Sequence, residues 1–374
     1  MSELAVIFGG PSPEHDVSVL TGLQAAHELQ RGGHAVHALY WSKTSEWFAV
    51  DASLEATAFL DGVPKGAQTL RLSLGEGGGF EGGGGRFSKQ KSSSFDVAVV
   101  CCHGGPGEDG TLQAALNGAG IAYTGPSVAS AALGLDKLAF GGVMAAAGIP
   151  TLARVALNAT TESIGFDGPY IVKPRFGGSS IGIEVVPDLT TAQALLSSSI
   201  HLRDGAVVEP YRPDLYDVQL AVRRWPETQT SAIERPLRST GRAGAGEGEI
   251  LGYTDKYVGG EGMASAPREL PAALPAGLQA ELHALAHRIA DLALVRGVAR
   301  LDFLTDGTEL VVNEINTIPG SLARYLWIDP MVPFATLLAD MVAEATARPT
   351  AHYSAAGADG LVLRGASSIA AKLA

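Results

Sequence analysis

A short stretch near residue 300 holds three oxygen-bearing side chains and an arginine. Asp302 lies on one apparent strand, and Glu314 and Asn316 lie two residues apart on the next, so these two point to one face. Antiparallel pairing would bring Asp302 beside them, and hard oxygen ligands of this kind suit Mg²⁺. Arg300 shares the face of Asp302 and is placed to meet a transferring phosphate. The alternative is the polar face of an exposed hairpin, although the surrounding run LVVNEINTIP resembles a buried strand.

A second candidate site begins at Lys173, which ends an apolar strand and precedes a loop rich in glycine and serine. The loop residues that could offer N–H groups or hydroxyls are Gly177, Gly178, Ser179, Ser180 and Gly182. Such groups could cradle a phosphate, with the lysine as a point charge. The lysine precedes the glycines, so the segment is neither a P-loop nor a G-x-G-x-x-G motif. A plain hairpin turn is the alternative interpretation.

Two further loops follow apparent strands nearer the N-terminus. Gly9 and Gly10 end the first strand and lead through Glu14 into a helix, and His103 begins a similar loop. Ligands bind at the carboxyl ends of parallel strands in α/β sheets, where Glu14 could hold an amine. His103 could equally be a buried structural histidine, and Asp109 a helix cap.

The elements that must position these residues follow an α/β order. Strand 4–10, helix 17–31 and strand 34–41 form a β-α-β unit, which predicts a parallel sheet. The later elements are predicted as strand 95–105, helix 111–119, strand 121–125, helix 128–147, hairpin 169–186, strands 207–211 and 217–224, helix 277–296, hairpin 298–317 and helix 330–346. The second hairpin turns at Asp306-Gly307. Two glycine-rich stretches, 75–86 and 239–249, are expected to be surface loops.

The composition limits the function classes. A chain of 374 residues with 46% hydrophobic and 18% charged residues is expected to form two or three domains. The net charge of −12 makes nucleic acid and anionic membranes poor partners. We expect no signal peptide and no membrane span. Cys101 and Cys102 are interpreted as buried hydrophobic residues in a reducing compartment, so we expect a cytoplasmic protein.

Eight segments, in order along nearly the whole chain, resemble the D-alanine–D-alanine ligases of the ATP-grasp superfamily. They are FGGPSPEHDVS (8–18), HGGPGEDGTLQ (103–113), YTGPSVASAALGLDK (123–137), AAAGIPT (145–151), YIVKPRFGGSSIG (170–182), YTDKY (253–257), RLDF (300–303) and NEINTIPG (313–320). The resemblance implies an α/β, three-domain ATP-grasp fold. Its expected parts are an N-terminal parallel-sheet domain (1–127), a middle lid domain (128–208) and a C-terminal catalytic domain (209–374), with ATP between the last two.

The resemblance also implies roles for individual residues. The expected ATP-binding residues are Lys137, Lys173 and Lys256, with Glu209 at the adenine amino group and Asp217 at the ribose. Two Mg²⁺ ions, or Mn²⁺, would bind Asp302, Glu314 and Asn316. The expected substrate-binding residues are Glu14, His103, Arg300, Gly320, Tyr325 and Leu326. The expected catalytic residues are Arg300 and the N–H of Gly320, which would stabilise developing charge, and the trio Glu14, Ser179 and Tyr257, which would tie the domains closed.

The implied reaction joins two small amino acids through an acyl-phosphate, but the acceptor segment departs from the family pattern. Tyr325 lies where a serine usually binds the second carboxylate, and Arg324 adds a charge. The phosphate loop also departs, because Phe176-Gly177 stand where an acidic residue is common. Tyr257 favours an amine acceptor. We therefore expect D-alanyl-D-alanine synthesis for peptidoglycan by a homodimer. The alternatives are an ATP-grasp ligase with a different acceptor and, disfavoured by the retained metal-binding and phosphate-binding residues, a non-catalytic ATP-binding protein.

Overall fold

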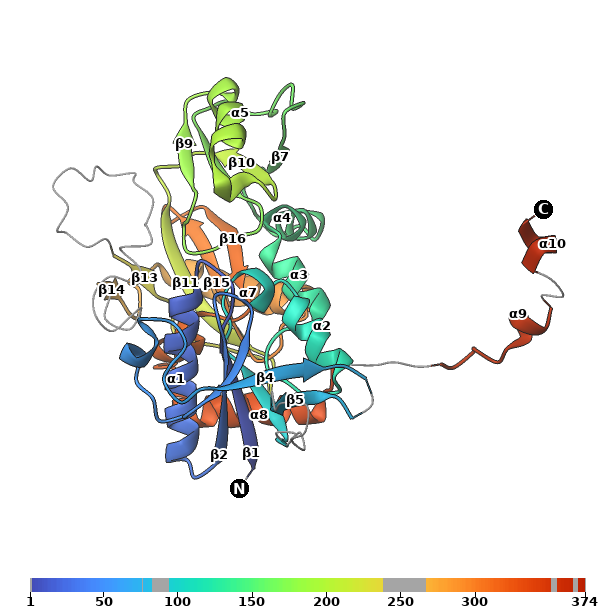
Figure 1. Cartoon of the computed structure of the whole chain (residues 1–374). Helices are drawn as coiled ribbons and strands as arrows, with labels where there is room; N and C mark the ends of the chain where they lie inside the picture. Colours follow the sequence, from blue (N-terminus) through green and yellow to red (C-terminus); the bar gives the residue numbers. More distant parts are fainter. Residues whose placement is uncertain are drawn as a thin grey trace.

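Three larger β-sheets and a two-stranded one organise the fold, and the sheet that contains β11, β15 and β16 lies between the other two larger sheets (Figure 1). The computed structural model describes residues 2–75, 77–82, 94–237, 267–350, 355–365 and 369–373. Along the chain, the three larger sheets follow the order of the three predicted domains. The division into domains at 127/128 and 208/209 stays a prediction, and the second boundary lies inside a strand, β10 (Ala206–Pro210).

The N-terminal sheet has the strand order β5-β4-β3-β2-β1-β6. β1 (Glu3–Gly9) pairs in parallel with β2 (Ala35–Trp41) and β6 (Val97–Val100), and α1 (His15–Arg31) connects β1 to β2, which confirms the predicted β-α-β unit. β3 (Trp47–Val50), β4 (Gln68–Ser73) and β5 (Gly79–Gly82) extend the sheet with antiparallel pairing. α2 (Thr111–Gly118) forms as predicted. The predicted strand 121–125 is reduced to one bridge between Tyr123 and Ala98.

The middle sheet has the order β7-β10-β8-β9 and is antiparallel throughout. It consists of β7 (Val155–Leu157), β8 (Tyr170–Pro174), β9 (Glu184–Val186) and β10, and α5 (Leu189–Ser198) packs against β8 and β9. β8 and β9 are the predicted hairpin 169–186, so the glycine- and serine-rich loop joins two strands.

The predicted helix 128–147 is wrong in one respect, because it is two helices. α3 (Val128–Leu135) and α4 (Lys137–Ala146) are separated at Asp136, whose φ of −78° and ψ of 97° leave the helical region. The Asp136 carboxylate accepts hydrogen bonds from the N–H groups of Leu138 and Ala139, so it caps α4. The break therefore makes Lys137 the first residue of a helix.

The C-terminal sheet has the order β12-β11-β15-β16. Its strands are β11 (Tyr216–Arg223), β12 (Gln229–Thr230), β15 (Val298–Thr305) and β16 (Leu310–Asn316), and α7 (Ala276–Leu292) packs against it. The predicted hairpin 298–317 is confirmed. α8 (Phe334–Ala347) returns to the N-terminal core, where Leu337 and Leu338 are buried. The remaining short elements are β13 (Arg235–Pro236), β14 (Arg268–Glu269), α9 (Leu361–Arg364) and α10 (Ile369–Leu373).

Candidate active site

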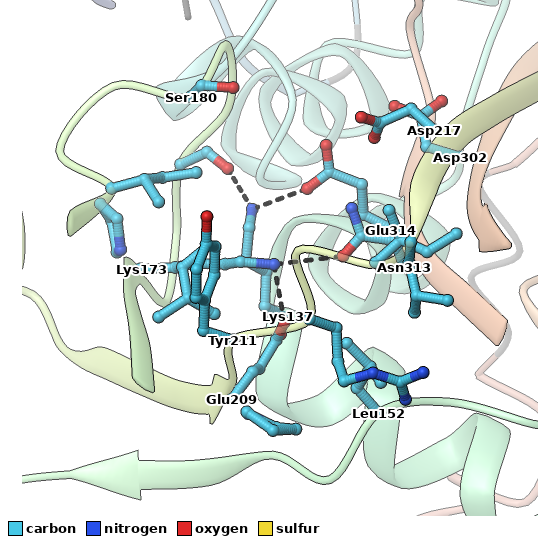
Figure 2. A pocket seen from close by; sticks show the side chains of 18 of the residues that line it. Lys137, Leu152, Lys173, Ser180, Glu209, Tyr211, Asp217, Asp302, Asn313 and Glu314 are labelled. Carbon is cyan, nitrogen blue, oxygen red and sulfur yellow. Dashed lines mark hydrogen bonds and ion pairs between the residues drawn. The ribbon is translucent and has the colours of Figure 1, made fainter. Parts of the chain in front are cut away.

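A cleft with an empty volume of about 970 Å³ lies between the middle and C-terminal sheets. One part of its lining is apolar and comes from both sheets. These residues are Leu152, Ile171, Ile181, Ile183, Leu215 and Leu304. The other part carries charge, and Figure 2 shows two lysines facing acidic and amide side chains there. An apolar slot continuous with a charged end suits a ligand that has a planar ring and an anionic tail.

Lys173 lies at the charged end, on β8, in contact with a buried acid. Its Nζ donates to Oε2 of Glu209 at 2.7 Å and to Oδ1 of Asn313 at 3.2 Å (Figure 2). The other oxygen of Glu209 forms an ion pair with Arg154. Burial alone would raise the pKa of Glu209, but the Lys173 ammonium and the Arg154 guanidinium outweigh it, so the pKa is lowered. Glu209 is therefore a carboxylate held between two cations.

Lys137 is the second cleft lysine, and the start of α4 places it there. Its Nζ donates to the carbonyl oxygen of Gly177 and lies 3.3 Å from Oε2 of Glu314. Its own N–H donates to the carbonyl oxygen of Arg175 at 3.1 Å, which fastens the helix start to the end of β8. Arg175 and Asp136 form an ion pair at 2.5 Å beside it. This packing places a second lysine, Lys137, beside the predicted phosphate-binding loop.

The carboxylates of the C-terminal hairpin converge as the strand pattern predicted. Asp302 pairs in register with Glu314, and Arg300 pairs with Asn316. Arg300 contacts both carboxylate oxygens of Asp302, at 2.7 and 2.8 Å, and the Asn316 amide donates to Asp302 at 3.2 Å. Glu314 lines the cleft from the opposite strand, and Asp217 on β11 lies close to Asp302 (Figure 2).

These hairpin side chains fit a divalent cation. In the described part of the chain, no three His, Cys, Asp or Glu side chains gather in a metal-binding arrangement. The hairpin itself offers two carboxylates, from Asp302 and Glu314, and the amide oxygen of Asn316. Hard oxygens that leave coordination positions to phosphate and water are typical of magnesium sites in phosphoryl-transfer enzymes.

A β-bulge on this hairpin was not predicted from the sequence. Asp302 pairs with Glu314, but the next residue, Phe303, pairs with Val312, so Asn313 is left over. The extra residue turns the Asn313 side chain toward Lys173. The apolar and polar alternation of the strand could not reveal this displacement.

The N-terminal domain reaches the cleft through Glu14, at the start of α1. The hydroxyl of Ser179 donates to the Glu14 carboxylate. Gly178 and Gly104 approach the same carboxylate so closely that a Cβ on either glycine would collide with it. Two members of the predicted trio therefore meet. Tyr257 and Lys256, the remaining closing-loop residues, lie outside the described residues.

His103 supports the loop that follows β16, which contains Gly320. Its Nδ1 is 2.6 Å from the carbonyl oxygen of Ile318, so Nδ1 carries the hydrogen and Nε2 accepts from the Thr21 hydroxyl at 2.8 Å. Thr21 in turn accepts from the N–H of Ser321 at 3.0 Å. Burial lowers the pKa of His103 to about 4, so the ring is neutral. Both ring nitrogens are engaged with protein atoms, and direct substrate contact by His103 stays a prediction.

Glu108 was missed as a functional residue, although it lies in the quoted segment HGGPGEDG. Its carboxylate accepts from the N–H groups of Gly104 and Ile318, both at 3.0 Å, and from the Thr317 hydroxyl at 3.1 Å. It therefore joins the loop after β6 to the loop after β16. Burial, with a smaller effect from Glu14, raises the pKa of Glu108 to about 7.

The acceptor segment places Tyr325 in a charged environment and buries Leu326 completely. The Arg268 guanidinium lies over the Tyr325 ring at 4.7 Å, and Arg268 is also 2.9 Å from the buried Glu234. Burial raises the pKa of the Tyr325 phenol well above its usual range. The phenol is therefore neutral.

Comparisons with known proteins decide the family. The model described as D-ala D-ala ligase N-terminus matches residues 3–126, and the one described as D-ala D-ala ligase C-terminus matches residues 131–343. The chain belongs to the D-alanine–D-alanine ligase family. It is 31% identical to the D-alanine–D-alanine ligase of Chlorobaculum tepidum over 341 residues, covering 85% of this chain and 88% of that one. With the ligase of Bradyrhizobium sp. (strain ORS 278) it shares 28% identity over 362 residues, covering 92% and 95%.

Solved structures agree on the fold. The D-alanine–D-alanine ligase from Helicobacter pylori matches with a TM-score of 0.71 and 24% identity, covering 91% of this chain and 98% of that one. The VanG D-Ala:D-Ser ligase from Enterococcus faecalis matches with a TM-score of 0.73 and 23% identity, covering 92% and 99%. The predicted ATP-grasp fold is thereby confirmed. Ligases whose names give different acceptors share it, so the fold alone does not identify the acceptor.

Proposed function

We propose that this family member joins two D-alanine molecules into D-alanyl-D-alanine, with ATP as the second kind of substrate, and so supplies peptidoglycan synthesis. The observation that carries the proposal is the convergence of Lys137 and Lys173 with Asp302 and Glu314 in one cleft. Two ammonium groups and two carboxylates are what a phosphate chain with its metal requires. The same four side chains lie within the matched family segments.

ATP binds along the cleft in this proposal. The apolar lining takes the base, with Glu209 toward the adenine amino group and Asp217 at the ribose. Lys137 and Lys173 then exchange their present partners, Glu314 and Glu209, for phosphate oxygens. The exchange keeps the ammonium groups paired throughout, which limits the cost of their burial.

Asp302, Glu314 and Asn316 would hold two Mg²⁺ ions, or Mn²⁺, when ATP is bound, and the ions would supply positive charge that offsets the charge of the phosphate chain. Arg300 is already fixed beside Asp302 by two contacts, so it would lie next to the bound phosphate chain. Its position lets it stabilise the charge on the equatorial phosphate oxygens.

The reaction proceeds in two displacements. The carboxylate of the first D-alanine, held through its ammonium group by Glu14, attacks the γ-phosphorus, and the bond to the departing ADP oxygen breaks. The amine of the second D-alanine then attacks the acyl-phosphate carbonyl, loses a proton, and phosphate leaves with the bonding electrons. Arg300 and the N–H of Gly320 stabilise the oxyanion of that step.

Closure protects the acyl-phosphate from water. The hydrogen bond between Ser179 and Glu14 joins the phosphate loop to the N-terminal domain, and Lys256 and Tyr257 complete the closure in this proposal. Tyr325 lies on the acceptor side in this proposal, whereas the side chain of Leu326 is buried in the hydrophobic core and its expected substrate contact stays a prediction. We further propose a cytoplasmic homodimer that binds neither nucleic acid nor membrane. The net charge of −12 disfavours nucleic acid and anionic membrane surfaces as partners. Separately, no described helix combines the length and apolar character needed to cross a membrane.

The experiment that tests the function measures phosphate release from Mg-ATP with D-alanine, other D-amino acids and L-amino acids, singly and in pairs, with product masses. D-alanine alone is expected to give D-alanyl-D-alanine, and Glu314→Gln is expected to form product at least about 10²-fold more slowly. If D-alanine is inert and another pair reacts, the acceptor has changed at residues 321–327 and the proposed product is wrong. If no amino acid stimulates phosphate release, the ligase proposal fails.

A further inference from the structure

Arg154 is a buried cation that contacts Glu209, a residue of the cleft lining, and none of the proposed roles uses it. It lies just before β7, and its side chain is 4% exposed. Its Nη1 donates to the carbonyl oxygen of Lys137 at 2.6 Å and its Nη2 to that of Asn313 at 2.8 Å, while its Nε faces Glu209. One guanidinium therefore contacts the three segments that carry the charged groups of the cleft.

The contact with Asn313 gives a backbone carbonyl of the β-bulge a hydrogen-bond partner. Asn313 is the residue without a register partner on β15, and its carbonyl oxygen accepts from Arg154. The segment before Arg154 is also fastened to β16, because Val312 donates to Pro150 at 2.9 Å and the Thr151 hydroxyl donates to Val312 at 3.2 Å. The bulge that turns Asn313 toward Lys173 is thus held from the middle domain.

The contact with Glu209 concerns charge. Glu209 is 0% exposed and has two cations, Lys173 and Arg154. If Lys173 moves to a phosphate, Arg154 still compensates the Glu209 carboxylate. Without Arg154, the same movement would leave a buried charge with no partner, which is strongly unfavourable. Lys173 would then stay with Glu209.

We propose that Arg154 is a positioning residue of the nucleotide site, which holds Glu209 and the Asn313 bulge so that Lys173 can leave Glu209 for a phosphate. This inference rests on the proposed function only as far as the nucleotide site, and not on the amino-acid substrates. It differs from a purely structural role because it predicts that removing the Glu209 charge relieves the loss of Arg154.

The experiment measures binding of ADP with MgCl₂ by titration calorimetry, without amino acids. Arg154→Met is expected to raise the Kd for ADP about tenfold or more, where tenfold corresponds to ~1.4 kcal/mol. Arg154→Lys keeps the charge but reaches fewer acceptors, so its Kd is expected between those of the native protein and Arg154→Met. The double variant Arg154→Met with Glu209→Gln is expected to bind ADP within about threefold of Glu209→Gln alone, because the Glu209 charge accounts for most of the Arg154 effect and the lost contacts with Lys137 and Asn313 account for the remainder.

Arg223 provides the matched control. It forms a 2.6 Å ion pair with Asp340, has a side chain 9% exposed, and lines no part of the cleft. Arg223→Met is expected to lower the thermal stability and leave the Kd for ADP unchanged. In steady-state assays, Arg154→Met should raise the KM for ATP and leave the KM for D-alanine within about twofold. The reason is that Arg154 affects how tightly ATP binds and does not contact the amino-acid substrates.

Three results would overturn the inference. They are native ADP affinity in Arg154→Met, equal weakening in Arg223→Met, and a double variant that binds ADP about tenfold more weakly than Glu209→Gln. If Arg154→Met does not fold, the double variant and Arg154→Lys still decide, because Arg154→Lys keeps a cation beside Glu209 and the double variant has no buried carboxylate without a cation. A native protein that binds ADP but does not ligate D-alanine would refute the proposed product and leave this inference standing.

Discussion

Glu108 allows the sharpest test of the electrostatics around the loop that follows β16. Its carboxyl is buried, and its pKa is raised to about 7 from an ordinary value of 4.5. A raised folded-state pKa means that the folded protein binds the proton more tightly than the unfolded chain. The associated stability is fully present below pH 4.5 and is lost as the pH rises through 7.

The change in pKa from 4.5 to about 7 corresponds to about 3 kcal/mol of stability, most of which is lost between pH 5 and pH 8. Glu108→Gln cannot titrate, so it lacks this slope. The free energy of unfolding of the native protein minus that of Glu108→Gln should therefore fall by about 2–3 kcal/mol from pH 5 to pH 8. Denaturant titrations at pH 5, 6, 7 and 8 measure this difference.

A direct titration supplies the control. Carboxyl-¹³C spectra of glutamate-labelled protein should contain a resonance with a midpoint near pH 7, and Glu108→Gln should lack it. Glu14→Gln should lower that midpoint, because the Glu14 charge contributes to the raised pKa. A flat stability difference across this pH range, or a Glu108 midpoint below pH 5, would refute the assignment of burial as the dominant cause.

Three other substitutions test separate parts of the site. Glu314→Gln should reduce phosphate release by about 10²-fold or more, because the metal would lose a charged ligand, and near-native release with Mg²⁺ would contradict the metal assignment. Gly104→Ala should lower the free energy of unfolding by about 1–3 kcal/mol, because φ is +62° and ψ is 172° and a Cβ would meet Glu14; an unchanged denaturation midpoint would show that the loop adapts. Thr21→Val should cost about 1–3 kcal/mol, since it leaves buried hydrogen-bonding groups without their partner, including Nε2 of His103, whereas Thr21→Ser should be nearly neutral in the same unfolding assay.

The hairpin that carries the proposed metal ligands was predictable because its signals are local. A two-residue spacing fixes which side chains share a face, and an Asp-Gly turn fixes which strands pair. The observed register between Asp302 and Glu314 follows from both. The bulge at Asn313 could not be predicted in this way, since one extra residue leaves the local composition unchanged.

Residues that act between domains were missed for a different reason. Arg154 lies in the segment TLARVAL, where one arginine resembles a surface residue on a short strand. Its partners are Lys137, Glu209 and Asn313, 17, 55 and 159 residues away. Only the folded chain shows that these acceptors surround it. A charged residue within an apolar run was the one available signal.

The loop after Gly320 connects these findings to catalysis. Ser321, Leu322 and Ala323 have φ values of 52°, 49° and 51°, which are unfavourable for residues with a Cβ by roughly 1–2 kcal/mol each. Three consecutive residues hold this conformation because the surrounding structure enforces it. Thr21 accepts from the N–H of Ser321, and Glu108 accepts from the N–H of Ile318.

Both supporting residues belong to the N-terminal domain, whereas the strained loop belongs to the C-terminal part of the chain. In the proposed mechanism, these contacts would hold the N–H of Gly320 in position as a charge-stabilising donor before substrates arrive. Strain of this kind persists only where buried hydrogen bonds outweigh it. The N-terminal domain would therefore contribute to the proposed chemistry through the geometry of this loop as well as through Glu14.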